Sequence, residues 1–300
     1  MNALAWRSAA SLAEHLELVA AEFAAADLFY GHGTDNAWDE AVFLCLSAMQ
    51  LPLDSSDLVL GQVVSQAHKD IIEHWVNERI LARKPLPYIT GVGWFAGKPY
   101  QVNEHVLIPR SPLAEVLLAQ GRPWLQHTPK HILDLCTGSG CIGIEAAHQF
   151  PQAQVDLVDI SRPALALAEH NAKAHGVSNR VRCLQSDGFA ALMGRCYDLI
   201  LLNPPYVGAA EMQDMPKEYQ HEPELALASG EDGLTLTHRL LREVGQYLNA
   251  QGVLFLEVGY SAEVLQASYP DFPFTWLEFA HGGEGVAVLN SDDCRYFQVL

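Results

Sequence analysis

The chain has 300 residues, 49% of them hydrophobic, which is enough for one large α/β domain and a smaller one. Its 36 acidic and 18 basic side chains give a formal net charge of -18, and the acidic residues are spread along the chain. Such a surface repels phosphate and attracts basic partners, so the composition argues against a protein that holds free nucleic acid.

The six cysteines are scattered, with no Cys-x-x-Cys pair and no histidine cluster at metal-ligand spacing. We therefore expect reduced, mostly buried thiols and no metal. Acidic residues interrupt the apolar stretch Met1–Phe23, and nowhere do about 18 apolar residues run together. The sequence predicts a soluble, cytoplasmic protein without a signal peptide or a membrane span.

The first third of the chain has the spacing of amphipathic helices, from about Ser8 to Ala82. Apolar residues recur there three and four positions apart, beginning with Leu12, Leu16, Val19 and Phe23. The segments Asp39–Met49 and Ile71–Leu81 continue the pattern. We predict a small helical bundle over residues 1–90.

A short β-hairpin is expected to follow the helices. Pro85 and Pro87 end the helical pattern. The apolar segments Gly93–Phe95 and Tyr100–Val102 then flank a turn at Ala96–Pro99. We predict a hairpin over residues 91–107 that links two domains.

Residues 108–300 alternate between strand and helix patterns, which is typical of an open, mostly parallel α/β sheet. The final part predicts an antiparallel hairpin at the edge of the sheet, in which His281–Gly285 joins two strands. The predicted strands are His131–Leu135, Val155–Asp159, Val181–Leu184, Tyr197–Leu202, Val253–Val258, Phe274–Phe279 and Val286–Leu289. The predicted helices are Cys141–Phe150, Pro163–His175 and Leu234–Leu248.

A glycine-rich loop follows the first predicted strand of this sheet. Gly138, Gly140 and Gly143 fit the pattern G-x-G-x-x-G, in which glycines allow the backbone to approach a nucleotide-like ligand at a helix N-terminus. Asp159 ends the next strand, where a carboxylate accepts hydrogen bonds from ribose hydroxyls; a helix N-cap is the alternative. The pattern fits a nicotinamide or flavin enzyme as well as a methyltransferase.

Two further aspartates favour a methyl donor over a dinucleotide. Asp134 stands just before the glycines, where a negative charge favours an aminoacyl sulfonium ligand and repels a pyrophosphate. Asp187 follows the third strand, in position to meet the adenine end of S-adenosylmethionine, although a plain turn aspartate is the alternative. The loop therefore predicts a nucleoside ligand without naming the reaction.

The quartet Asn203-Pro204-Pro205-Tyr206 follows the fourth predicted strand and indicates the chemistry. An amide nitrogen is a poor nucleophile, so an enzyme must orient it with hydrogen-bond acceptors. The Asn203 side-chain oxygen and the Pro204 carbonyl can accept its two N–H groups, and the consecutive prolines hold that carbonyl in place. Tyr206 can stack on a planar acceptor. A rigid turn after a strand is the structural alternative.

Nearly the whole chain resembles the protein-(glutamine-N5) methyltransferases. The helical region, the hairpin, Leu107–Arg110, the glycine loop, the quartet and His221–Gly230 carry the resemblance. It implies a Rossmann-like class I S-adenosylmethionine-dependent methyltransferase domain, with a seven-stranded sheet, and an N-terminal domain that recognises the substrate. It also implies that Asn203–Tyr206 hold the glutamine. The donor contacts that it implies are Cys136, Thr137, Gly138, Ser139, Gly140, Asp159, Asp187, Gly188 and Asn203.

Two branches of that family differ in the protein that they methylate. The branch acting on peptide chain release factors usually continues Pro-Arg with Pro-Asp-Thr-Glu, whereas Ser111-Pro112-Leu113-Ala114 follows Arg110 here. Tyr30–Glu40 is similar to the branch that methylates the third large-subunit ribosomal protein. We therefore expect a basic ribosomal protein as the substrate, with release factors as the alternative. The release-factor branch also tends to have an aromatic residue where Gly188 stands, whereas the aromatic Phe189 follows one position later here.

Two more residues are candidate substrate contacts. Phe95 either packs near the acceptor amide or belongs to the core, and Arg110 either anchors the substrate loop or pairs with a carboxylate.

The sequence also allows three rival functions. The first is an enzyme that methylates an exocyclic amine of nucleic acid, which the charge of -18 disfavours. The others are an NAD-dependent oxidoreductase and a non-catalytic assembly factor.

Overall fold

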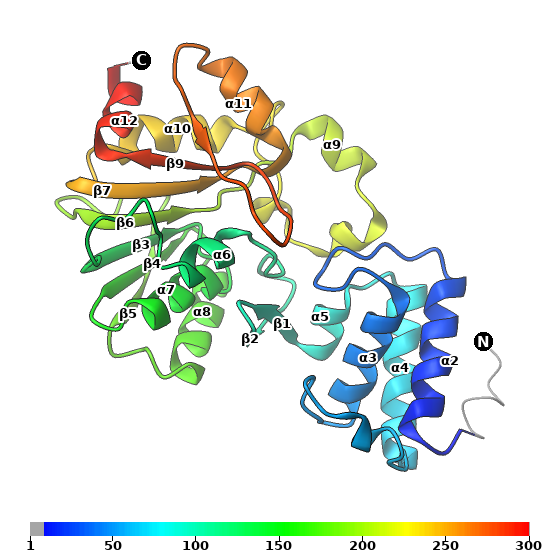
Figure 1. Ribbon diagram of the computed structural model, residues 1–300. Helices are drawn as coiled ribbons and strands as arrows, with labels where there is room; N and C mark the ends of the chain where they lie inside the picture. The colour runs from blue at the N-terminus through cyan, green and yellow to red at the C-terminus, as the bar shows by residue number, and fades with distance from the viewer. Residues whose placement is uncertain (1–8, 300) are drawn as a thin grey trace. The chain divides into compact units, whose positions relative to one another are not determined.

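The computed structural model describes residues 9–299 of the chain (Figure 1). The first eight residues of the predicted helical domain, including Ser8, lie outside the described residues. The chain forms two compact units: one runs to Gly93 and includes Pro216–His221, and the other comprises Trp94–Met215 and continues from Glu222. The division falls inside the predicted linking hairpin.

The first unit contains four α-helices among the described residues: α2 (Leu12–Ala25), α3 (Ala37–Ala48), α4 (Gln66–Leu81) and α5 (Leu86–Thr90). Polar side chains fix where the longer helices begin, because each accepts a hydrogen bond from a backbone N–H of the first turn. Ser11 caps α2 in a capping box with Glu14, Asn36 caps α3, and Ser65 caps α4. The predicted helical periodicity of this region is confirmed.

The buried faces of these helices form one apolar core, which includes Leu16, Phe23, Leu44 and Ile72. The prediction that helix ends at Pro85 and Pro87 was wrong in one respect, since α5 begins at Leu86 with a proline in its first turn. Proline is tolerated there because the N–H that it lacks would have no helical partner.

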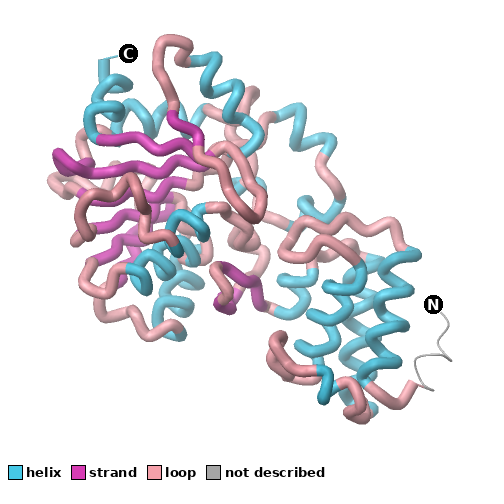
Figure 2. The backbone as a smooth tube through the Cα atoms, viewed as in Figure 1, coloured by secondary structure: helices cyan, strands magenta, loops and turns pink. Residues whose placement is uncertain are grey.

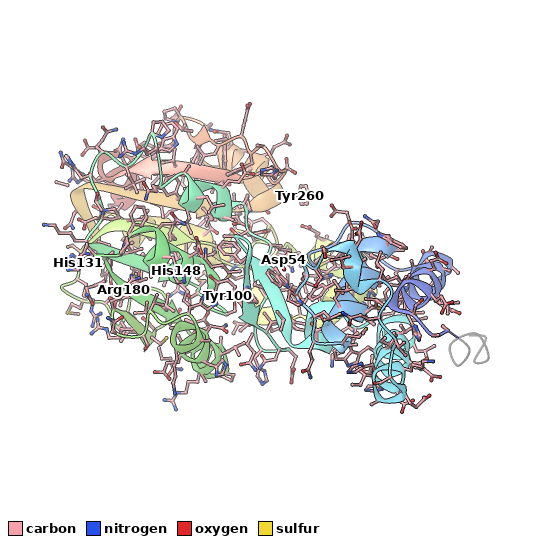
Figure 3. All side chains as sticks on the ribbon, turned by 60° about the horizontal axis from the view of Figure 1, so that its bottom comes forward. Asp54, Tyr100, His131, His148, Arg180 and Tyr260 are labelled. Atoms are coloured by element: carbon pink, nitrogen blue, oxygen red, sulfur yellow. The ribbon has the colours of Figure 1, made fainter. Side chains whose placement is uncertain are left out.

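The predicted hairpin is present where the two units divide: β1 (Val92–Phe95) pairs with β2 (Lys98–Gln101). Asn171 of α8 (Arg162–Ala174), 1% exposed, holds both the hairpin and the glycine loop. Its side chain exchanges hydrogen bonds of 2.9 and 3.0 Å with the backbone of Gln101 and donates a third, of 2.9 Å, to the carbonyl of Ser139. Tyr100, labelled in Figure 3, stacks on the His175 ring at 4.3 Å.

A seven-stranded sheet forms the centre of the second unit, in the order β5-β4-β3-β6-β7-β9-β8. Five strands are parallel, and β9 pairs antiparallel with both β7 and β8. The strands are β3 (His131–Leu135), β4 (Gln154–Asp159), β5 (Val181–Gln185), β6 (Tyr197–Leu202), β7 (Leu248–Glu257), β8 (Thr275–Trp276) and β9 (Val286–Asn290). The predicted fold class, with its antiparallel edge, is confirmed.

Helices cover both faces of this sheet (Figures 1 and 2). Side chains alternate along each strand, so Ile132 packs on one face and Leu133 on the other. One face packs against α6 (Leu113–Leu118), α7 (Cys141–Gln149) and α8. The other packs against α10 (Thr235–Val244), α11 (Ala262–Ser268) and α12 (Ser291–Tyr296).

Several predicted boundaries in the second unit were wrong. The helix predicted over Leu234–Leu248 ends at Val244, and β7 begins at Leu248, five residues before the predicted strand. The extra strand residues are partly polar and include Gly252, so they carry no apolar signal. β8 has only two residues, and α6, α9 (Ala209–Asp214), α11 and α12 were not predicted. No helix within residues 9–299 is both long and apolar enough to cross a membrane.

Candidate active site

The glycine loop and the Asn-Pro-Pro-Tyr quartet follow adjacent strands of the sheet. From β3 the chain moves outward through β4 to β5, and β6 then returns to the other side of β3. Leu135 of β3 pairs with Leu202 of β6, so Cys136 and Asn203 are the next residues of neighbouring parallel strands. Ligands of open α/β sheets bind at such a reversal of strand order, beyond the carboxyl ends of the strands.

A cavity of about 390 Å³ opens at this point within the second unit. Its lining includes the glycine loop, the ends of β4 and β5, and one side of the Asn-Pro-Pro-Tyr quartet. Of the predicted site residues it contacts Cys136, Thr137, Gly138, Ser139, Asp159, Asp187, Gly188, Asn203, Pro205 and Arg110. Asp134, Gly140, Pro204, Tyr206 and Phe95 do not line it.

Several residues of the glycine loop have left-handed backbone conformations, which make its turn tight. Cys136, Gly138 and Gly140 have positive φ angles of 65°, 54° and 82°. Gly140 serves as N-cap of α7, and a Cβ there would lie 3.0 Å from Ala168. At Gly143 a Cβ would lie 2.2 Å from Leu157, so only glycine lets α7 approach the sheet this closely.

Asp134 lies beneath this loop and is fully buried. One carboxylate oxygen accepts hydrogen bonds from the Gly143 N–H, at 2.8 Å, and from the Thr137 hydroxyl. The other oxygen has no hydrogen-bond partner within residues 9–299. Burial raises the pKa of Asp134 to about 7, although the hydrogen bonds from Thr137 and Gly143 oppose this shift. A cationic group nearby would favour the charged carboxylate, and a contact between Asp134 and the donor stays a prediction.

Asp159 ends β4 at the wall of the cavity. Its carboxylate accepts the backbone N–H of Gly138 and that of Ser161, both at 2.9 Å, and so connects the glycine loop to the start of α8. Burial raises the pKa of this group, and the backbone hydrogen bonds lower it. Lone pairs remain on both oxygens for ribose hydroxyls.

Asp187, which also lines the cavity, forms an ion pair with Arg239 of α10. Gly188 has a φ of 56°, and a Cβ there would lie 2.8 Å from Leu240. The following Phe189 is fully buried and stacks on Tyr247 at 4.4 Å, so it does not line the cavity. Arg239 was missed from the sequence, because nothing marks one arginine of an amphipathic helix as a cavity residue.

The quartet begins one residue after β6. Asn203 and Pro205 are partly exposed at the cavity, whereas Pro204 is buried. The Tyr206 carbonyl accepts the Ser261 hydroxyl at 2.8 Å, and the Tyr206 hydroxyl donates to Glu257 at 3.3 Å. Gly259 leaves room for the Tyr206 ring, since a Cβ there would lie 2.7 Å from it. Hydrogen bonds from Ser261 and to Glu257 therefore hold the quartet in place through Tyr206.

Glu257, the last residue of β7, was also missed from the sequence. The residue is 4% exposed, and its carboxylate accepts hydrogen bonds from the hydroxyls of Ser111 and Tyr206. Burial raises the pKa of Glu257 to about 7; hydrogen bonds from Ser111, Tyr206 and Asn203 and the charge of Arg110 oppose this shift. The available signal was a carboxylate directly after the apolar run Val253–Leu256, at the carboxyl end of a predicted parallel strand.

The two remaining candidate substrate residues have protein partners. Arg110 forms a two-pronged ion pair with Glu222, with both N–O distances at 2.7 Å, and Glu222 also accepts the Ile108 N–H at 2.9 Å. Phe95 is 3% exposed and packs edge-on against Tyr100, with 6.3 Å between ring centroids. Contact of either residue with a substrate remains a prediction.

Comparison with known proteins agrees with this geometry. Residues 114–222 match the family described as "Methyltransferase small domain". The crystal structure of the hMettl16 catalytic domain in complex with MAT2A 3'UTR hairpin 6 has a TM-score of 0.52, covering 77% of this chain and 85% of that chain. Its identity is 14%, so the likeness concerns the fold alone.

Two curated relatives extend over nearly the whole chain. A ribosomal protein uL3 glutamine methyltransferase of Francisella tularensis subsp. tularensis is 45% identical over 298 residues, covering 96% of this chain and 95% of the relative. That of Neisseria meningitidis serogroup A is 44% identical over 276 residues, covering 91% and 90%. The predicted family is thereby confirmed, in the branch expected from Tyr30–Glu40 and Ser111: the chain belongs to the ribosomal protein uL3 glutamine methyltransferases.

Proposed function

We propose that this protein transfers a methyl group from S-adenosylmethionine to the side-chain amide nitrogen of a glutamine in ribosomal protein uL3. The observation that carries the proposal is the position of Asn203. It leaves β6 beside the glycine loop of β3 and lines the same cavity. A nucleoside donor and a carboxamide acceptor can therefore meet in one pocket. The relatives, named for this reaction on uL3, support the same choice of substrate.

The cavity residues fit S-adenosylmethionine. Asp159 offers carboxylate oxygens to the ribose, while Ile160 and Leu236 provide an apolar lining for a base. Asp134 does not line the cavity, but its buried carboxyl beneath the glycine loop would complement the charge of a cationic methionyl end. When bound, the donor supplies an electrophilic methyl on a positively charged sulfur and leaves as neutral S-adenosylhomocysteine.

Asn203 and Pro204 orient the acceptor in this scheme. The Asn203 side-chain oxygen accepts one amide N–H and the Pro204 carbonyl accepts the other, which turns the nitrogen lone pair toward the methyl. The nitrogen gains a C–N bond and positive charge, and it then loses one proton to solvent. Hydrogen bonds to a group that is becoming charged contribute roughly 1.5–3 kcal/mol each, so the two acceptors supply an appreciable part of the rate together with alignment.

Charge complementarity favours a ribosomal protein over nucleic acid as the partner. The chain carries a formal net charge of -18, which attracts basic proteins and repels phosphates. We assign substrate recognition to the helical unit, which also includes Pro216–His221 from the segment that follows the quartet. The chain that follows the quartet thus links the unit proposed to transfer the methyl group to the unit proposed to recognise the substrate.

The test is incubation of the protein and labelled S-adenosylmethionine with unmethylated uL3, with release factors in parallel, followed by peptide mass spectrometry. We expect one methyl group on a glutamine of uL3. Label on a release factor instead would assign the other branch, and label on neither would refute the proposal. The matched variant Asn203→Ala should bind the donor but transfer no methyl, which separates a catalyst from a binding factor.

A further inference from the structure

A buried carboxyl lies directly behind the residue that holds the acceptor amide. Leu202 of β6 pairs with Leu256 of β7, so Asn203 and Glu257 are the next residues of two adjacent parallel strands. Neighbouring strands lie about 4.8 Å apart, and paired residues present their side chains on the same face. Glu257 does not line the cavity, and Asn203 does.

The carboxyl of Glu257 accepts hydrogen bonds from two segments, the one that contains Ser111 and the quartet. Ser111, which follows the hairpin linker, donates its hydroxyl to Glu257, and its oxygen also accepts the Leu113 N–H at 3.1 Å. Tyr206 donates its hydroxyl to the other carboxylate oxygen at 3.3 Å. Asn203 stands beside Glu257 in the strand register, and its side chain is a third group that lowers the pKa of this carboxyl.

This arrangement has a consequence for the Asn203 amide, whose two ends are nearly identical in shape but opposite in function. A carboxylate only accepts hydrogen bonds, so the Asn203 NH2 must be the end that faces Glu257. The Asn203 oxygen is then left for the substrate. With the opposite orientation, an NH2 group would face the N–H groups of the glutamine, where nothing could accept them.

We propose, on the basis of the function proposed above, that Glu257 is a positioning residue that fixes the orientation of the Asn203 amide and anchors Tyr206. It touches neither substrate nor donor. It acts by making the quartet present acceptors to the glutamine nitrogen. A protonated Glu257 could instead donate to the Asn203 oxygen, which would turn the NH2 toward the substrate.

The surroundings of Glu257 make this orientation sensitive to pH. Burial raises its pKa to about 7, and the groups that face it are Ser111, Tyr206, Asn203 and the cationic Arg110. Arg110 is itself paired with Glu222, and the residue opposite Glu257 on β9 is the apolar Val286. The active, ionised form of Glu257 is therefore expected to prevail above about pH 7 and to be lost as the pH falls through the pKa.

The variant Glu257→Gln tests the proposal, because it keeps the size of the side chain but removes the charge that dictates the Asn203 orientation. We expect kcat on uL3 to fall about ten- to a hundredfold, with the Kd for S-adenosylmethionine unchanged within about twofold. The acid limb of the kcat–pH profile should disappear. Glu263→Gln makes the same chemical change at an exposed position of α11 and should behave as the wild type.

A role in stability alone gives a different pattern. In that case Glu257→Gln lowers the Tm, while the folded enzyme keeps its kcat and its acid limb, and this result would overturn the proposal. Ser111→Ala provides a second test that leaves Glu257 in place. It removes a hydrogen bond that lowers the Glu257 pKa, so the acid limb should move to higher pH; an unmoved limb would contradict the proposal.

A measurement without substrate separates this proposal from the choice of uL3. The side-chain NH2 signals of Asn203 in the 15N-labelled protein, assigned with Asn203→Asp, should titrate near pH 7 in the wild type. They should not titrate in Glu257→Gln. If uL3 takes up no methyl but these signals titrate as expected, the proposed function fails and the role of Glu257 stands. Signals that do not respond to pH or to the variant refute the role of Glu257.

Discussion

Arg79 of α4 offers a test of how the first unit holds the segment that follows the quartet. The side chain is 1% exposed and lies between two buried carboxylates, Glu40 of α3 and Glu218 of Pro216–His221. Its guanidinium donates to Glu40, to Glu218 at 3.1 Å and to the Phe29 carbonyl at 2.7 Å. The Arg79 guanidinium is thus shared by three acceptors from three segments.

Replacing Arg79 with methionine preserves most of the volume but leaves both carboxylates buried without their shared partner. Removal of one member of a buried ion pair costs about 3–5 kcal/mol, because the remaining charge is neither hydrated nor paired. Arg83 lies 3.7 Å from Glu218 and compensates in part, so we expect a loss of about 3 kcal/mol. An exposed ion pair contributes only about 0–1 kcal/mol, which gives a matched control in Arg295→Met, whose partner is Asp292.

Urea unfolding of the two variants, followed by linear extrapolation, measures the difference in the free energy of unfolding. Limited trypsin digestion should in addition cleave Arg79→Met faster after the exposed Lys217, since Glu218 no longer holds that segment. The reasoning is refuted if Arg79→Met loses no more stability than Arg295→Met and Lys217 is cleaved at the wild-type rate.

Three further predictions concern the donor loop and the partner. Asp159→Ala should raise the Kd for S-adenosylmethionine about tenfold or more, because it removes the ribose acceptor and the bonds to Gly138 and Ser161; an unaltered Kd by calorimetry would displace the ribose assignment. Gly143→Ala should lower the Tm, since a Cβ 2.2 Å from Leu157 costs about 1–3 kcal/mol, more than the gain of about 1 kcal/mol in helix propensity; an equal or higher Tm would show that α7 can move away. Added salt should raise the KM for uL3 while kcat stays constant, and a KM that does not respond would argue against charge as the basis of recognition.

The parallel strands of the sheet were predictable because their sequence signal is local. Short, mostly apolar runs form the strands His131–Leu135 and Tyr197–Leu202, which lead into the glycine loop and the quartet, and both strands have the predicted bounds. The positions of the motifs follow from the chain order, since a loop after a parallel strand must lie at the carboxyl edge of the sheet. Chain order alone therefore places the glycine loop and the quartet at the same edge.

The contacts that depend on distant segments were not predictable in this way. Glu257 meets Ser111 across 146 residues, and Arg79 meets Glu218 across 139. Neither pair has a periodicity or spacing that joins its members. The inclusion of Pro216–His221 in the helical unit is a non-local feature of the same kind. The short helix α9 was missed because six residues carry too little pattern, and the strand predicted over Phe274–Phe279 is only two residues long in β8.

The central claim, that Asn203 and Pro204 hold both hydrogens of the acceptor amide, is tested most directly by a crystal structure. The protein would be crystallised with S-adenosylhomocysteine and a glutamine-containing peptide of uL3. We predict that the glutamine nitrogen lies within about 2.7–3.2 Å of both the Asn203 side-chain oxygen and the Pro204 carbonyl oxygen, with the sulfur on its open side. A glutamine bound elsewhere, or with its carbonyl oxygen turned toward Asn203, would contradict the account.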